Sequence, residues 1–431
     1  MSNSLRIALT LLVFSSLAVL TTNQEIYGRL SYLWLFLITG NYFLSRLALR
    51  NLNLRRIPRS LKNQVGEIFE ETFQLENKGR LPRIWIEIED QSTLPGSKGS
   101  RVLTLVAGRS TRSYVSRMKL TQRGAYPMGP TIIRSGDPFG FFPVSKHIGS
   151  KSDLTVYPRL VDVRTFPSPI GLLPGGDSVR RRTHQITPNA STVREYVAGD
   201  PINRIHWAST ARRDKLMVKE FELDPLAEVW LFLDGQKRVH GAKQYSLDPD
   251  VGQVLLGKRS DNRLAPATEE YMATIAASVS RFFISQDRAL ALTISNRFSN
   301  DLAPDRGPRQ FSKIMEALAL MKADGGLAFS AFVLNQARHL TRGSTLVMIT
   351  PSADEEIAYM VDSVQRLGIR PIVILLNGLS FGKMRSNVEL AEKLRATNIP
   401  TILINEGEDL RNSLNSQSQA NFQTQTRSVI A

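Results

Sequence analysis

Two apolar segments within the first 50 residues constrain this chain more than any other feature of its sequence. The first, LRIALTLLVFSSLAVL, runs from Leu5 to Leu20, and the second, LSYLWLFLITGNYFLSRLAL, runs from Leu30 to Leu49. A helix needs about 20 mostly apolar residues to cross a bilayer. The sequence therefore predicts a transmembrane helical hairpin over residues 1–50, joined by the short loop TTNQEIYGR. A cleaved signal peptide for the first segment, or two core helices, are the alternatives.

Basic residues near the end of the second segment set its expected orientation. They are Arg46, Arg50, Arg55, Arg56, Arg59 and Lys62. The loop between the two segments holds only Arg29. An excess of Lys and Arg beside a span marks its cytoplasmic side. We therefore expect a multi-pass protein of the cell membrane, with everything after residue 50 in the cytoplasm.

The whole chain is basic, with 55 Lys and Arg against 39 Asp and Glu, and a formal net charge of +16. This balance suggests contact with phosphate, in nucleic acid or in anionic lipid headgroups. Anchoring to anionic membrane lipid explains part of it. A nucleic-acid partner is not expected, because no aromatic residues are interleaved with the basic runs. The chain has no cysteine, which excludes disulfides and Cys-ligated zinc.

The hydrophobic period divides the rest of the chain and predicts an α/β plus β protein. Residues 60–165 alternate apolar and polar side chains, with Glu71 as an exception, and predict a β-sandwich domain. Residues 166–224 are a Pro- and Gly-rich connector followed by a densely charged segment. Residues 225–405 alternate short continuous apolar runs with helix-like stretches, which predicts a doubly wound parallel sheet. Residues 406–431, rich in Ser, Gln and Asn, are expected to be a disordered tail.

The charged segment, VREYVAGDPINRIHWASTARRDKLMVKEFELD, raises the question of an active site. A structural interpretation makes Asp200 the N-cap of a helix and Pro201 its first residue. Trp207, Ala208 and Ala211 then lie on one apolar face of that helix, together with Ile205.

The catalytic alternative assigns the same segment to a hydrolase or nuclease. Glu195, Asp200 and His206 would serve as acid, base and orienting group. The structural interpretation is favoured, in which the charges form a salt-bridge clasp, and no catalytic residue is assigned.

This segment resembles the hallmark of the bacterial domain of unknown function 58 family, R-x-Y-x-x-G-D-x-x-R-x-I-x-W-x-x-[ST]-A-R followed by L-x-V-K-x-[FY]-E. A second match is RGAYPMGPTIIRSGDPFGFF, which begins at Arg123. The signature positions in the two motifs are Arg194, Tyr196, Gly199, Asp200, Arg204, Trp207, Arg212, Lys219, Glu222, Arg123, Gly124, Asp137 and Gly140.

The resemblance implies a β-sandwich fused to a von Willebrand factor A-like sheet domain. It also implies a membrane-tethered partner of a MoxR-type AAA+ ATPase, in protein maturation or envelope-related processes. Von Willebrand factor A domains often hold Mg²⁺ at D-x-S-x-S, where this chain has Asp234 followed by Gly-Gln-Lys-Arg. Both Ser positions are lost, so the site is degenerate and neither a metal nor another cofactor is expected.

Taken together, the sequence favours a protein-interaction module that is not an enzyme. Its expected partners are an AAA+ ATPase and membrane lipid. The expected contact face is the carboxyl edge of the parallel sheet, where ligands bind in open sheets. The long connection over residues 236–267 is the candidate binding loop.

Overall fold

The computed structural model describes residues 2–22, 24–95, 100–149, 152–167, 190–197, 205–221, 228–244, 264–297, 301–382 and 385–415. The chain divides into two compact units. The first comprises Met1–Leu160, Gly241–Ala277 and Met315–Lys322, and the second comprises Val161–His240, Ser278–Ile314 and Ala323–Ala431. The prediction of a mixed α/β chain with an apolar N-terminal helix is confirmed.

Two helices begin the first unit, α1 (Asn3–Thr22) and α2 (Glu25–Ala48). They pack against each other, and a hydrogen bond of 2.8 Å joins the hydroxyls of Ser16 and Ser31. Within the described residues, only α1 is long and apolar enough to cross a membrane. The expected multi-pass arrangement is not supported by this criterion. Helix α2 carries Glu25 and Arg29 in its first turns and Arg46 in its last, and these shorten its apolar stretch.

The β domain consists of two sheets that face each other across a common core. One sheet has the order β1 (Leu52–Pro58), β3 (Ile68–Asn77), β6 (Ser110–Lys119). The other has the order β5 (Ser100–Val106), β4 (Arg83–Asp90), β8 (Thr131–Ser135), β9 (Val144–Ile148). Phe73 and Leu75 of the first sheet pack against Ile86, Ile88 and Ile133 of the second. The strands begin at Leu52, earlier than the predicted boundary at residue 60, because β1 follows α2 after a short turn.

A third sheet extends the β domain, with the order β2 (Lys62–Gln64), β10 (Asp153–Tyr157), β7 (Gly124–Pro127). It contributes Leu154 and Val156 to a second core, where they pack with Phe69, Met118 and Leu120.

Glu71 interrupts the apolar face of β3 because it binds a buried arginine. It lies between Phe69 and Phe73 on the inward face and is almost fully buried. Arg56 of β1 donates two hydrogen bonds to the Glu71 carboxylate, at 2.8 and 3.0 Å, and two to Asp90 of β4, at 2.8 and 3.1 Å. One guanidinium thus joins strands of the two facing sheets, in the bidentate geometry that makes such pairs strong. Burial raises the pKa of Glu71, and the bonds from Arg56 oppose this shift.

The second unit contains a six-stranded sheet with the order β15 (Leu302–Asp305), β14 (Leu290–Ile294), β13 (Val229–Leu233), β16 (Thr345–Thr350), β17 (Arg370–Leu376), β18 (Thr401–Ile404). All neighbouring pairs are parallel except β14 and β15. The strand order reverses at β13, which is the topology of a doubly wound sheet.

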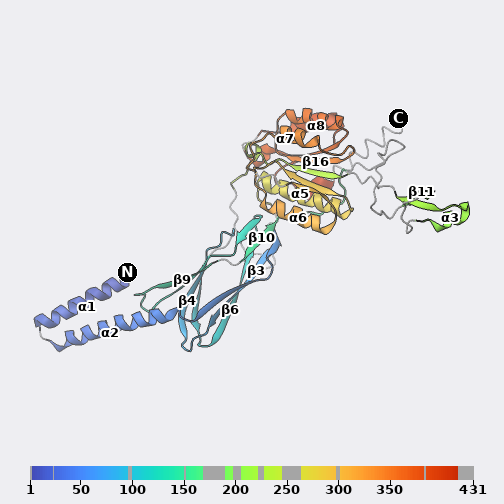
Figure 1. The fold of residues 1–431 in the computed structure, drawn as a ribbon. Coiled ribbons are helices and arrows are strands. Elements are labelled where there is room, and N and C mark those ends of the chain that lie inside the picture. Colours follow the sequence, from blue (N-terminus) through green and yellow to red (C-terminus); the bar gives the residue numbers. More distant parts are fainter. Residues whose placement is uncertain are drawn as a thin grey trace. The chain divides into compact units, whose positions relative to one another are not determined.

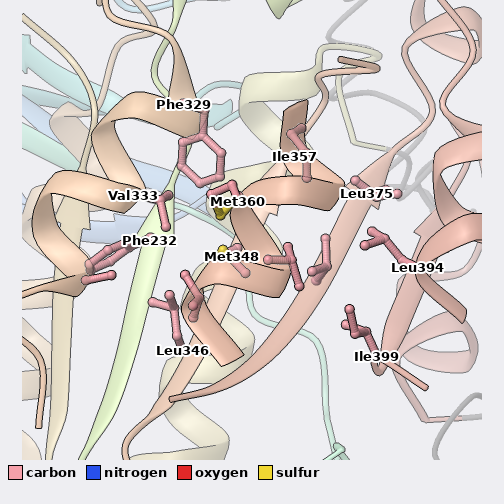
Figure 2. Packing of buried hydrophobic residues seen from close by; sticks show 14 of the residues in the cluster. Phe232, Phe329, Val333, Leu346, Met348, Ile357, Met360, Leu375, Leu394 and Ile399 are labelled. Carbon is pink, nitrogen blue, oxygen red and sulfur yellow. The ribbon is translucent and has the colours of Figure 1, made fainter. Parts of the chain in front are cut away.

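Helices cover both faces of this sheet. Helices α7 (Phe329–Ala337), α8 (Glu356–Arg366) and α9 (Val388–Ala396) pack on one face, where Figure 2 shows Phe329, Val333 and Met360 gathered over Phe232 and Met348. On the opposite face lie residues 278–285 of α5 (Thr268–Ser285) and residues 307–314 of α6 (Gly307–Leu320) (Figure 1). Burial on both faces explains why the strands are continuously apolar.

Part of the segment expected to be a disordered tail, residues 406–415, belongs to the described structure. Residues 410–415 are helical, and Leu410 and Leu414 are buried. The Asn415 side chain accepts hydrogen bonds from the backbone N–H groups of Arg164 and Thr165, at 2.8 and 2.9 Å. Apolar burial and these bonds order a stretch that composition alone assigned to the tail. Residues 416–431 lie outside the described part.

The Arg56 network predicts a large loss of stability when the guanidinium is removed. Arg56→Met leaves the carboxylates of Glu71 and Asp90 buried without their counter-ion, and breaking such a pair costs about 3–5 kcal/mol. The free energy of unfolding, measured by urea titration, should fall by this amount. The matched control is Arg59→Ala, which removes an exposed pair with Glu70 and should cost about 1 kcal/mol or less. Equal losses in the two variants would contradict the assignment.

Candidate functional site

The charged segment folds into a hairpin that carries a short helix. Strands β11 (Ala190–Glu195) and β12 (Met217–Phe221) pair antiparallel, and α3 (Trp207–Arg213) lies between them in the chain. Arg194 pairs with Val218 and Lys219 with Val193, while Tyr196 follows β11 and donates its N–H to the carbonyl of Leu216, at 2.8 Å. The predicted signature residues Gly199, Asp200, Arg204 and Glu222 lie outside the described residues.

The start of α3 differs from the prediction. His206, not Asp200, is the N-cap, because its Nδ1 accepts the N–H of Ser209 at 3.2 Å and lies 2.7 Å from the Ser209 hydroxyl. Within the predicted apolar face Ile205, which precedes α3, is buried, whereas Trp207, Ala208 and Ala211 are exposed. Helix α3 contains no buried residue, and Trp207 is 66% exposed, so its ring is available to something other than the core. Arg212 is exposed on the same helix.

The catalytic alternative for this segment finds little support in the described geometry. His206 is engaged in capping α3 through its Nδ1. Glu195 forms an exposed ion pair with Lys215, at 3.0 Å. Asp200, the third member of the proposed group, lies outside the described residues. The His206–Ser209 contact is therefore explained by helix capping alone.

Arg123 and Gly124, from the second motif, have a structural role within the first unit. The buried Arg123 guanidinium donates to the carbonyls of Leu318 and Met321, at 3.0 and 2.9 Å, and forms an ion pair with Glu270 of α5. Burial raises the pKa of Glu270, and the charge of Arg123 opposes this shift. Gly124 has φ of +152°, and a Cβ there would meet the Tyr126 ring at 3.1 Å. These positions hold two helix ends against a strand and contain no reactive group.

Asp137 and Gly140 shape a turn between β8 and β9. The fully buried Asp137 carboxylate accepts the backbone N–H groups of Phe139, Phe141 and Phe142, at 3.2, 3.0 and 2.6 Å. Gly140 has φ of +70°, a left-handed conformation that glycine adopts without cost. The motif thus fixes a turn that presents several phenylalanines.

Small polar side chains surround Asp234 at the carboxyl end of β13. Asp234 is fully buried, and its carboxylate accepts the Thr350 hydroxyl at 2.6 Å and the backbone N–H of Gln236 at 3.0 Å. The Ser295 hydroxyl, after β14, accepts the N–H of Gly235 at 2.9 Å. Strands β14 and β16 lie on opposite sides of β13, so this is the point where strand order reverses and where ligands bind in open sheets.

The sequence pointed to Asp234 and to Thr350, which ends an apolar strand where von Willebrand factor A domains often carry Asp, but Ser295, which directly follows another apolar strand, was missed. The carbonyl oxygens of the Asn296 and Asn377 side chains, at the same edge, are buried with no hydrogen-bond partner among the described residues. Buried acceptors of this kind are uncommon in folded proteins. A polar residue directly after each apolar run is the signal that marks this edge in the sequence.

This edge does not fit the Mg²⁺ site of von Willebrand factor A domains. Both carboxylate oxygens of Asp234 already accept hydrogen bonds from the protein. The Asp354 carboxylate accepts the Ser352 hydroxyl, at 2.9 Å. Among the described residues no group of three or more His, Cys, Asp or Glu is placed to hold a metal. Hard divalent cations such as Mg²⁺ require several oxygen ligands.

Comparison with known proteins points to one family. Residues 192–246, which include most of β11 and all of α3, β12 and β13, match the family model described as Protein of unknown function DUF58. Over 311 residues the chain is 21% identical to the Uncharacterized protein YeaD of Bacillus subtilis (strain 168), a span that covers 69% of this chain and 70% of that protein. The two matches support membership of the DUF58 family.

The solved structures add no argument about fold. The CARDB domain of the PF1109 protein from Pyrococcus furiosus is 11% identical, with a TM-score of 0.18, and covers 24% of this chain and 91% of that chain. The alkylpurine DNA glycosylase AlkC from Pseudomonas fluorescens is 9% identical, with a TM-score of 0.16, and covers 30% of this chain and 39% of that chain. TM-scores this low establish no shared fold.

Asp234 predicts a specific dependence of stability on pH. Burial and, to a smaller extent, the charge of Asp354 raise the pKa of Asp234 from 3.8 to about 6, while the bonds from Thr350 and Gln236 oppose the shift. Between these two values the folded state binds a proton that the unfolded chain does not, so the contribution of Asp234 to stability falls as pH rises. Asp234→Asn removes this dependence. Above pH 6 it should be more stable than the parent chain by up to about 3 kcal/mol.

The measurement is urea unfolding at intervals from pH 4 to pH 8. The difference between Asp234→Asn and the parent chain should vanish near pH 4. Asp362→Asn, at an exposed ion pair with Arg366, is the control and should show no comparable trend. A difference that stays constant over the whole range would contradict a raised pKa at Asp234.

Proposed function

We propose that this protein is a membrane-tethered interaction module whose folded units bind a protein partner in the cytoplasm. The resemblance to the domain of unknown function 58 family identifies the expected partner as a MoxR-type AAA+ ATPase, in protein maturation or envelope-related processes. In this proposal the second unit is the von Willebrand factor A-like domain, and α1 and α2 both enter the bilayer. The basic residues beyond α2 favour the cytoplasmic side for everything that follows.

The observation that carries this proposal is the exposure of Trp207. A tryptophan in a folded protein normally buries its large apolar ring. Here the ring lies in solvent on α3, inside the stretch that matches the DUF58 family model. Val197 and Leu216, on the hairpin that carries α3, are also exposed. We call these three residues the Trp207 surface.

Charge beside this surface supports a protein partner. Arg212 and Arg213, in the last turn of α3, are exposed. Tryptophan and arginine are the residues most enriched at the energetic centres of protein interfaces. The carboxyl edge of the sheet around Asp234 is the second candidate contact face. Much of its expected binding loop, residues 245–263, lies outside the described residues.

Trp207→Ala tests the Trp207 surface. Co-purification with a tagged MoxR-type AAA+ ATPase from the same organism should be lost, since removing an interface hot spot costs about 2 kcal/mol or more. Thermal unfolding should not change, because the ring buries little surface. Tyr359→Ala is the matched control, since Tyr359 of α8 is an aromatic residue with 69% exposure.

Deleting residues 245–263 in parallel separates the two candidate faces. Retention of the ATPase by Trp207→Ala, with loss on deletion of the loop, would assign the contact to the sheet edge. Retention by both variants would contradict both surfaces.

Membrane tethering is tested separately by fractionation. The intact chain should sediment with membranes and resist extraction by salt and alkali, because α1 is long and apolar enough to span the bilayer. Removal of residues 2–50 should move it to the soluble fraction. Protease added outside intact cells should leave the region after residue 50 uncut. Cleavage there would overturn the cytoplasmic orientation.

A further inference from the structure

The turns at one end of the β domain lie directly beside the end of α2. Lys78 donates its N–H to the carbonyl of Asn51 at 3.0 Å, and Arg83 donates a side-chain bond to the carbonyl of Arg50 at 3.1 Å. The β5–β6 turn lies next to the β3–β4 turn, since Arg109 donates its N–H to the carbonyl of Gly79 at 2.8 Å. We call this end the anchor-proximal rim, defined as residues 78–85, 105–109 and 136–142.

The β8–β9 turn of the rim packs on the two apolar helices. Phe141 and Phe142 belong to a cluster with Leu5 and Ala8 of α1 and with Trp34, Leu37 and Ile38 of α2. The Ser2 hydroxyl donates to the carbonyl of Phe141 at 2.8 Å, and the rings of Tyr42 and Phe142 meet edge to face, with centroids 5.5 Å apart.

These contacts place the turn alongside the apolar part of α2. Trp34 and Ile38 precede Arg46 by twelve and eight residues, or roughly 12–18 Å along the helix axis. Arg46 is the residue expected to reach the membrane interface. A turn that contacts α2 at Trp34 and Ile38 therefore lies on the lipid side of Arg46 if α2 enters the bilayer.

The rim exposes large apolar side chains that the core does not use. Phe139, in the same turn, is 57% exposed. Trp85 is 49% exposed and has φ of +55°, a left-handed conformation that is an outlier for a bulky residue. Successive strand residues normally point to opposite faces, yet Ile84 and Trp85 are both exposed. Backbone strain of this kind concentrates at functional sites.

Cations accompany the apolar side chains of the rim. Arg80 and Arg109 are exposed in the turns that flank Ile84 and Trp85, and Arg50 is exposed where α2 ends. Lys78 lies 3.8 Å from Glu76, the acidic residue at this end of β3. Tryptophan at the headgroup level, phenylalanine below it and basic residues around them are the composition of interfacial membrane contacts.

We propose that the anchor-proximal rim is itself a membrane-binding surface, in which Phe139 enters the acyl region beside α1 and α2 while Trp85 lies among anionic headgroups contacted by Arg80 and Arg109. The occupant is the bilayer, because the rim is continuous with the helices that form the proposed anchor. This inference rests on the membrane tethering in the proposed function. It adds that the β domain is held against the surface and does not swing freely on α2.

The test uses the absence of cysteine from the chain. Single-cysteine variants Phe139→Cys and Trp85→Cys of the full-length protein carry an environment-sensitive fluorophore. They are reconstituted into vesicles of phosphatidylcholine and phosphatidylglycerol that contain spin-labelled lipids. The matched control is Leu61→Cys, an apolar position with 39% exposure that lies beyond the opposite end of β1, just before β2.

We expect lipid quenching at position 139 to be several-fold greater than at position 61, with a label depth of about 5–10 Å below the headgroups. The probe at position 85 should be quenched by headgroup-labelled lipid more than by chain-labelled lipid. In an Arg80→Glu, Arg109→Glu background, quenching at position 85 should fall severalfold, while vesicle flotation remains complete.

Failure of the membrane-binding rim and failure of membrane tethering give different results. Complete flotation with equal quenching at positions 139 and 61 overturns the membrane-binding rim and leaves the tethering intact. A chain that does not float with vesicles overturns both. Quenching at position 139 that is abolished by adding the ATPase would assign the rim to a protein partner and also overturn the proposal. Circular dichroism of each variant confirms that the labelled chains are folded.

Discussion

The bidentate bonds from Arg56 to Glu71 and Asp90 are the interaction on which the β domain depends. Arg56 lies in β1, the first strand after α2, and it connects both facing sheets through a single buried cation. Its guanidinium also lies over the Phe73 ring, 4.8 Å from the ring centroid. A charge removed from water must have every bond satisfied or it costs more than it contributes. Here that requirement fixes how β1, β3 and β4 meet, and so how the turns at the end of α2 are positioned.

The sequence predicted the fold well wherever the side-chain period carries the information. The alternation around Ile86 and Ile88 became a strand with one buried face, and the continuous run TLVMIT became a strand buried on both faces. Ile84, predicted to share the face of Ile86 and Ile88, is exposed. Glu71 was visible as an exception, but its explanation needs Arg56, which lies 15 residues away and belongs to a different strand. The pairing of Arg56, Arg59 and Lys62 with carboxylates of the protein was likewise not visible in the sequence, where they counted only as basic residues beyond the second apolar segment. Pairing across strands cannot be derived from local periodicity.

The candidate site was harder to predict, because the signature residues have different structural roles in separate parts of the chain. In the sequence, Arg123 and Asp137 are charged signature residues. In the structure both are buried, and both form hydrogen bonds with backbone groups. Trp207 was predicted to lie on an apolar helix face, yet it is exposed, because α3 is too short and too polar to bury a face. His206 replaced Asp200 as the cap because the helix starts later than the Asp-Pro pair suggests. Around Asp234 the sequence showed the acid and Thr350 but not Ser295, because a polar residue after a strand does not by itself show which side chains meet at the sheet edge.

Arg123 has a consequence for how the β domain holds the ends of α5 and α6. Its one guanidinium is shared between carbonyls of Leu318 and Met321 and the carboxylate of Glu270. Loss of any partner leaves a buried cation with an incomplete shell, so the remaining bonds become costly to keep. The contacts of Arg123 therefore depend on one another, and the ends of α5 and α6 are held to the start of β7 by all of them together.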